Sequence, residues 1–252
     1  MKQVRQILKE VALVLVLLLV GGVVMLGIGA GGTPPEELRN YFIDQGLVET
    51  GAVNLVSSIY LGYRAFDTFG ETIVLLLAVS GVIFIIDRKE LTRTKAERPT
   101  IGNYDRYGRH RTEILDLISR KLAPYVMLFG LYLISHGHLS PGGGFQGGVV
   151  LASGIILLTL GKGVDKIEAM FPIKRVALAE AGTFLLLLGI GVVGIFYGGT
   201  LFENFLPGGG PGDPSEANRI PLVSHVFFLN LIIGLKVGAG ISLISLSLFK
   251  EE

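Results

Sequence analysis

The chain has 252 residues, of which 50% are hydrophobic and 17% are charged, and its formal net charge is only +1. The charges cluster between long uncharged stretches, which is typical of a protein that crosses the membrane several times. A net charge this close to zero argues against nucleic acid as a partner. Because cysteine is absent, disulfides, iron–sulfur clusters and thiolate metal sites are excluded.

Six segments are long and apolar enough to cross the hydrocarbon core of a membrane, which needs about 20 residues of helix. We therefore predict an all-α fold, a polytopic transmembrane helical bundle of about six spans. In chain order the segments cover residues 11–28, 68–86, 122–139, 145–161, 176–197 and 222–249.

The first segment follows Lys2, Arg5 and Lys9 and could also be interpreted as a secretory signal. Its apolar core is longer than the 7–15 residues of such signals, so we expect a retained helix. The connection that follows, residues 33–64, contains a moderately apolar stretch at residues 53–63. One interpretation of that stretch is a helix lying at the membrane interface.

Arg64, Asp67 and Glu71 stand at spacings of three and four around the start of the second segment. If a helix begins near Ser57, these side chains share one face. Arg64 can pair with only one of the two carboxylates, so one acid is left over. Asp67 and Glu71 are therefore ion-path candidates, with Arg64 as a structural partner. The alternative is a simple ion pair at the start of the helix.

A basic, polar stretch separates the second and third segments. We predict a cytoplasmic linker at residues 96–112 between a two-helix module, residues 1–95, and a four-helix module, residues 113–252. The alternative is an extension of the second span that lies along anionic lipid headgroups.

Lysine and arginine mark the cytoplasmic side of a membrane protein. In the six-span arrangement, the segments on one side carry most of the 22 basic residues. The other side carries only Arg39, Arg64 and Arg219. This asymmetry predicts that both termini are cytoplasmic.

His136 and His138 end the third segment, before a glycine-rich stretch that leads into the fourth. Residues two apart on a helix cannot both face one metal ion, so we predict no metal site here. A half-buried His136 is a candidate for a proton or sodium path, and the alternative is a capping role.

Glu180 lies one turn into the fifth segment, just after Lys174 and Arg175. A carboxylate at this depth is either an ion-path residue or an acid at the start of a helix that reaches the headgroups. Its pairing cannot be read from the pattern, so both interpretations stay open.

Lys236 interrupts an otherwise uncharged run near the middle of the last segment. A lysine at mid-depth costs about 3 kcal/mol on insertion scales, so it faces the bundle interior or a wet cavity. Gly234 and Gly238 form a small-xxx-small pair that permits close helix packing, and Lys236 points nearly the opposite way. Gly144 and Gly148 repeat this packing signal.

Two stretches of the chain resemble subunits of known membrane complexes. HGHLSPGGGFQGGVVLASGIIL at residues 136–157 and NLIIGLKVGAG at residues 230–240 resemble the B subunit of Mrp-type multisubunit sodium/proton antiporters and its counterpart in membrane-bound hydrogenases. NLVSSIYLGYRAFDTFGETIVLLLAVSG at residues 54–81 resembles the carboxy-terminal tail of the antiporter A subunit, which is a small chain of its own in the hydrogenases. The chain thus resembles a fusion of two neighbouring small subunits.

The resemblance implies a multi-pass subunit of the cell membrane. Its partners would be the lipid bilayer, other antiporter-module membrane subunits including a large proton-pumping chain, and a peripheral hydrogenase-like redox arm in some complexes. The implied role is sodium/proton exchange, with Na⁺ or H⁺ as transported ions, no cofactor bound by this chain and no catalysis of its own. The alternative function is a structural scaffold that holds the pumping chains without conducting ions.

Carried over residue by residue, the resemblance supports Glu71, His136 and Lys236 as path residues. Its support for Glu180 and Asp67 is weaker. No nucleophile–base pair and no metal-ligand set emerges from the sequence, so we do not expect an enzyme active site.

Overall fold

The computed structural model describes residues 36–92, 113–204 and 225–251, together with the short pieces 14–15, 18–19, 21–22 and 25–26. These residues form helices and turns and contain no strand, so the predicted all-α class is confirmed. Apart from the short pieces, the predicted first span lies outside the described residues, as does the predicted linker. The chain divides into two compact units, residues 1–42 and residues 43–252.

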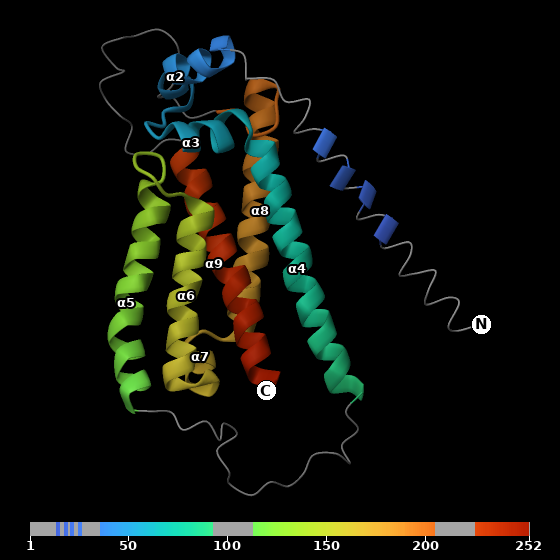
Figure 1. The fold of residues 1–252 in the computed structure, drawn as a ribbon, viewed down its shortest axis with the longest axis vertical. Helices are drawn as coiled ribbons and strands as arrows, with labels where there is room; N and C mark the ends of the chain where they lie inside the picture. Colours follow the sequence, from blue (N-terminus) through green and yellow to red (C-terminus); the bar gives the residue numbers. More distant parts are fainter. Residues whose placement is uncertain are drawn as a thin grey trace, which may run out of the picture. The chain divides into compact units, whose positions relative to one another are not determined.

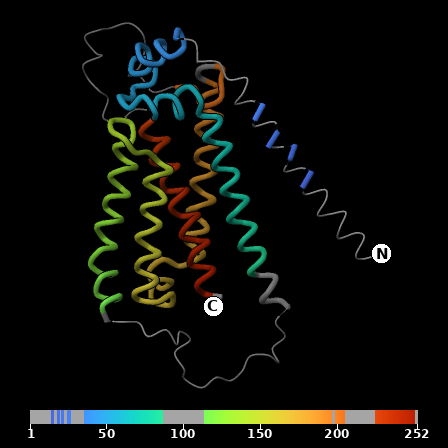
Figure 2. Tube along the Cα trace, viewed as in Figure 1, coloured from blue at the N-terminus to red at the C-terminus, as the bar shows by residue number. Residues whose placement is uncertain are grey.

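The helices of the described residues are shown in Figures 1 and 2. In chain order they are α2 (Glu36–Thr50), α3 (Leu55–Ser57), a π-helix (Ser58–Tyr63), α4 (Ala65–Thr92), α5 (Glu113–His136), α6 (Gly144–Lys162), α7 (Val164–Met170), α8 (Ile173–Gly198) and α9 (His225–Glu251).

Five of the described helices are long and apolar enough to cross a membrane, as predicted for a multi-pass protein. The span within α5 begins at Ile114, whereas the sequence-based segment began at Leu122. The difference arises because a helix can continue past the hydrocarbon edge, and the first turns of α5 carry Asp116 and Arg120. The five spans are Ala65–Ile86, Ile114–His136, Gly144–Lys162, Ile173–Phe196 and His225–Lys250.

Helix α9 is the central element of the second unit. It packs against α6, α8 and α4, and α5 packs on the far side of α6 (Figure 1). Apolar residues of α9, including Leu229, Ile233 and Val237, belong to one buried cluster. Leu246, nearer the end of α9, belongs to a second cluster with residues of α5, α6 and α7.

Glycines bring the backbones of α6 and α9 together. A Cβ atom on Gly148 would lie 2.7 Å from the carbonyl oxygen of Gly234, and one on Gly144 would lie 2.7 Å from that of Asn230. On α9, a Cβ atom on Gly234 would lie 2.6 Å from Cγ1 of Ile134 in α5, and one on Gly238 would lie 3.1 Å from Cδ2 of Leu151 in α6. Small residues at this interface therefore permit close helix contact.

Candidate functional site

Lys236 is completely buried in the bundle, with 0% exposure. Its ammonium nitrogen Nζ donates a hydrogen bond of 2.8 Å to the carbonyl oxygen of Thr72 in α4. The glycine face of α9 meets α5 and α6, so Lys236 lies on the side that meets α4 and α8. The charge is thus enclosed by protein.

Glu180 of α8 is the acidic partner of Lys236. The two atoms Glu180 Oε1 and Lys236 Nζ are 3.2 Å apart, and the Glu180 residue is 3% exposed. This distance makes a buried ion pair between the two helices. The ammonium is therefore held by the backbone carbonyl of Thr72 and by its ion pair with the Glu180 carboxylate. We call Lys236, Glu180 and Thr72 the Lys236 site.

Arg64, Asp67 and Glu71 lie at the start of α4 with different surroundings. Arg64 precedes the helix, and its Nε donates to Asp67 Oδ2 at 2.7 Å, in an ion pair of two exposed side chains. Glu71 is exposed on α4 and has no ion pair or hydrogen bond among the described residues. The next residue, Thr72, is buried and faces Lys236. Successive side chains on a helix point about 100° apart, so Glu71 is exposed while the neighbouring Thr72 is buried.

The expectation of a half-buried imidazole at His136 is wrong. His136 is exposed, its ring stacks on Tyr132 at 4.4 Å between centroids, and its Nδ1 lies 2.9 Å from Ser135 Oγ. The buried imidazole is His138, which is 2% exposed and whose two ring nitrogens have no hydrogen-bond partner among the described residues. The helix ends at His136, so the turn that follows sends the two side chains to different environments.

A buried amide links three segments near these histidines. Asn230 Oδ1 of α9 accepts hydrogen bonds from the Tyr60 hydroxyl and from the backbone N–H of Gly144, each at 2.8 Å. The amide thereby satisfies one of the free N–H groups at the start of α6. Its Nδ2 has no partner among the described residues. A Cβ atom on Gly143, at φ 150°, would lie 2.2 Å from the Tyr60 hydroxyl, so a glycine is required there.

A polar clasp, formed by Asn54 and Ser57, holds the turn between α5 and α6. Asn54 Nδ2 donates to the carbonyl oxygens of Gly137 and Ser140, each at 2.9 Å. The Ser57 hydroxyl also donates to the carbonyl of Gly137. The backbone N–H of Asn54 donates to the carbonyl of His138 at 3.0 Å. The clasp therefore joins the two parts of the chain that resemble different subunits.

Burial changes the ionisation of two groups beside this clasp. Desolvation raises the pKa of the Tyr60 hydroxyl, whereas the hydrogen bond that it accepts from Ser57 and the one that it donates to Asn230 lower it. Desolvation lowers the pKa of His138, and the nearby His136 lowers it further. Both groups are therefore neutral near pH 7.

Thr72, Asn230, Tyr60 and His138 were not recognised in the sequence as site residues. Asn230 could have been identified from the sequence, because a polar amide within a membrane span needs a hydrogen-bond partner. Thr72 acts through its backbone carbonyl, which every residue has, so no side-chain pattern could have identified it. Among the described residues, no group of three or more His, Asp or Glu side chains could hold a metal ion.

Two family models match this chain. Residues 114–243, more than half of the chain, match a domain related to the MnhB subunit of Na⁺/H⁺ antiporters. Residues 12–100 match the E subunit of a complex abbreviated MBH. The predicted resemblance to an antiporter B subunit and a hydrogenase-type small subunit is therefore confirmed.

Individual proteins show the same likeness over most of the chain. The uncharacterized protein MJ1307 of Methanocaldococcus jannaschii is 31% identical over 199 residues, which cover 75% of this chain and 74% of that protein. A probable A/B subunit of a K⁺/H⁺ antiporter from Rhizobium meliloti is 26% identical over 242 residues. That match covers 86% of this chain but only 24% of the relative.

A solved structure shows that the fold occurs within a larger assembly. A chain of the membrane-bound sulfane sulfur reductase, an archaeal respiratory membrane complex, has a TM-score of 0.68 and 27% identity. The match covers 96% of this chain and 98% of that one. Taken with the family models, these likenesses establish that the chain belongs to the family of proteins with a domain related to the MnhB subunit of Na⁺/H⁺ antiporters.

Proposed function

We propose that this chain is a membrane subunit of a multisubunit cation/proton antiporter module and that the Lys236 site forms part of its sodium or proton passage. The family membership and the name of the Rhizobium meliloti relative support the antiporter module. The main observation in favour of the passage is the fully buried Lys236, which pairs with Glu180, because both residues lie within membrane-spanning helices.

Electrostatics gives this pair a means of acting on a passing ion. At an effective dielectric constant of about 20, two unit charges 4 Å apart attract by about 4 kcal/mol. A cation or proton that reaches Glu180 competes with Lys236 for the carboxylate. The Thr72 carbonyl still holds the ammonium while Glu180 is occupied. The lysine then repels the cation and biases it to leave.

The proposed passage continues through α4 to Glu71 and requires another chain. An ionised side chain in contact with lipid costs several kcal/mol, so such residues usually face protein or water. Glu71 is exposed on this chain, and a neighbouring subunit would cover it. Glu71 would bind or relay the cation there, with Asp67 as a weaker candidate. His136 is also exposed on this chain, so a neighbouring subunit would cover it too, and it would gate proton access.

We propose the same module boundaries as above, with residues 1–95 and 113–252 as two membrane modules and residues 96–112 as a cytoplasmic linker. The partners would be a large proton-pumping chain and the other antiporter-module subunits in the cell membrane. A peripheral redox arm would be a further partner in complexes like the sulfane sulfur reductase. The chain would contribute ion transport without catalysis of its own.

A structural scaffold is the second candidate function. The polar clasp favours it, because four hydrogen bonds tie the turn between α5 and α6 to residues 54–57. In this case the buried Lys236 and Glu180 fix the register of α8 against α9 and keep the complex together.

Sodium-dependent proton transport by vesicles that hold the whole complex distinguishes the two functions. We compare Lys236→Met with Lys250→Met, because Lys250 is an exposed lysine of the same helix that pairs with Glu168. An assembled but inactive Lys236→Met complex and an active control support conduction. Dissociation of the complex on native gels supports the scaffold, and normal transport by both Lys236→Met and Glu71→Ala complexes refutes the passage.

A further inference from the structure

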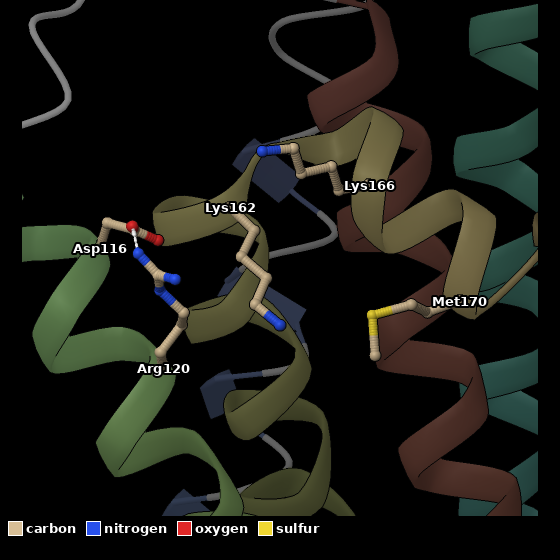
Figure 3. A pocket seen from close by; sticks show the side chains of 5 residues that line it. All are labelled: Asp116, Arg120, Lys162, Lys166 and Met170. Carbon is tan, nitrogen blue, oxygen red and sulfur yellow. Dashed lines mark hydrogen bonds and ion pairs between the residues drawn. The ribbon is translucent and has the colours of Figure 1, made fainter.

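A cavity of about 270 Å³ lies where α5, α6 and α7 meet, and its lining includes no residue of the Lys236 site. Figure 3 shows side chains from all three helices around it. Its lining residues are Asp116 and Arg120 of α5, Lys162 of α6, and Lys166 and Met170 of α7. We call it the α5–α7 pocket.

The lining of the α5–α7 pocket is cationic. Three of its five residues are basic and one is acidic. The acid, Asp116, already forms an ion pair with Arg120 on the next turn of α5. Lys162 and Lys166 add two further positive charges, so the pocket has a net charge of +2. Its ligand is therefore expected to be an anion.

The pocket lies at the membrane boundary of two spanning helices. The span of α5 begins at Ile114, and the span of α6 ends at Lys162. The turns of these helices that carry the pocket residues also present exposed apolar side chains, Leu117 and Leu160. Polar headgroups and the first carbons of acyl chains meet at this level, so one molecule could contact both the cations and the apolar side chains.

We propose that the α5–α7 pocket binds the phosphate headgroup of an anionic phospholipid, with the acyl chains along α5 and α6. Arginine and lysine bind phosphate through charge-assisted hydrogen bonds, and basic pockets between membrane helices hold anionic headgroups. Met170, 55% exposed at the rim, provides an apolar surface beside the headgroup. The lipid would join α5, α6 and α7 at the end of the bundle.

The basic end of the bundle supports this assignment. The same end carries Lys174 and Arg175 at the start of α8 and the Lys250–Glu168 pair between α9 and α7. By the positive-inside asymmetry it faces the cytoplasm, where the leaflet is rich in anionic lipid. The basic residues at this end attract anionic lipids in general, and the α5–α7 pocket adds a cavity in which one headgroup can bind.

The test compares two double variants of the full chain, purified and delipidated in a neutral detergent. Lys162→Gln/Lys166→Gln removes two pocket charges, and Lys174→Gln/Arg175→Gln removes two exposed charges outside the pocket. Phosphatidylglycerol, phosphatidylcholine and inorganic phosphate are titrated against each protein, with thermal unfolding and native mass spectrometry as readouts. Each ligand that binds the folded state raises the unfolding temperature.

We expect phosphatidylglycerol to stabilise the natural chain and the Lys174→Gln/Arg175→Gln control. It should bind the Lys162→Gln/Lys166→Gln variant about thirtyfold more weakly, because this is the usual contribution of two basic residues to binding an anionic lipid. Equal binding to both variants overturns the proposal. Equal stabilisation by inorganic phosphate would instead identify a site for soluble anions, and equal binding of phosphatidylcholine would show that the headgroup charge is not recognised. If the pocket variant loses a neighbouring subunit from the whole complex while its lipid binding is unchanged, the cavity is a protein interface and the lipid assignment is wrong.

Discussion

The ion pair between Lys236 and Glu180 predicts a strongly non-additive pair of substitutions. Lys236→Met keeps a side chain of similar length but leaves the buried Glu180 carboxylate without its cation. Glu180→Gln leaves the buried ammonium with only the Thr72 carbonyl that it already contacts. The double variant removes both charges and keeps similar side-chain volumes.

The magnitude follows from the burial of both partners, at 0% and 3% exposure. Removing one partner of a buried ion pair costs about 3–5 kcal/mol, whereas replacing both by neutral groups is often close to neutral. A chain of this size shifts its unfolding temperature by about 2–4 °C per kcal/mol. Each single variant should therefore unfold roughly 10 °C lower than the natural chain, and the double variant should recover most of that loss.

The assay is thermal unfolding of the full chain in lipid nanodiscs, followed by far-ultraviolet circular dichroism because the chain contains no tryptophan. Lys250→Met, which breaks an exposed ion pair, should change stability by less than about 1 kcal/mol. If the losses of the two single variants simply add in the double variant, the two charges do not interact as described. Transport by the whole complex then separates the functions, since a stable but inactive double variant indicates conduction and a stable, active one indicates a scaffold.

Three further outcomes are expected. Gly148→Ala should lower the unfolding free energy by about 1–3 kcal/mol because the added Cβ would meet the α9 backbone. Gly182→Ala should be neutral or stabilising, because no atom lies within 4 Å of the added Cβ. Equal losses of stability for the two variants in chemical denaturation would contradict this reasoning. Glu71→Gln should change the unfolding free energy of the isolated chain by less than about 0.5 kcal/mol but lower transport by the whole complex, and undiminished transport would remove Glu71 from the passage. Burial lowers the pKa of His138 in the folded chain, so the unfolded chain binds a proton on this imidazole more readily. The stability that neutral His138 contributes is therefore present above about pH 6.5 and is lost as the pH falls below that value. His138→Gln should flatten this slope between pH 7 and pH 5, and an unchanged slope would contradict the burial of a neutral imidazole.

Much of the fold was accessible from the sequence because a lipid environment imposes length and hydropathy on each span. The described spans match five of the predicted segments closely, and the largest difference is the extra turns at the start of α5. Lys236 was predicted to face the bundle interior from the cost of its charge alone. The glycine spacing likewise predicted a close-packed face on the other side of α9.

The pairing within the site depended on tertiary structure. Glu180 and Lys236 are far apart in sequence, and only the register of α8 against α9 brings the carboxylate within 3.2 Å of the ammonium. The end of α5 at His136 was also decisive, because the turn that follows the helix sets where the His138 side chain lies.

The amino-acid sequence by itself determined that the chain is a multi-pass helical membrane protein of an antiporter-related family with a charge buried at mid-depth, because hydrocarbon tolerates few other arrangements. Only the tertiary structure decided which groups neutralise that charge, that Glu71 is left on the outer face, and that three basic side chains surround one cavity. Such contacts depend on how helices are rotated and shifted against one another, and those displacements are set by many small packing interactions across the whole bundle.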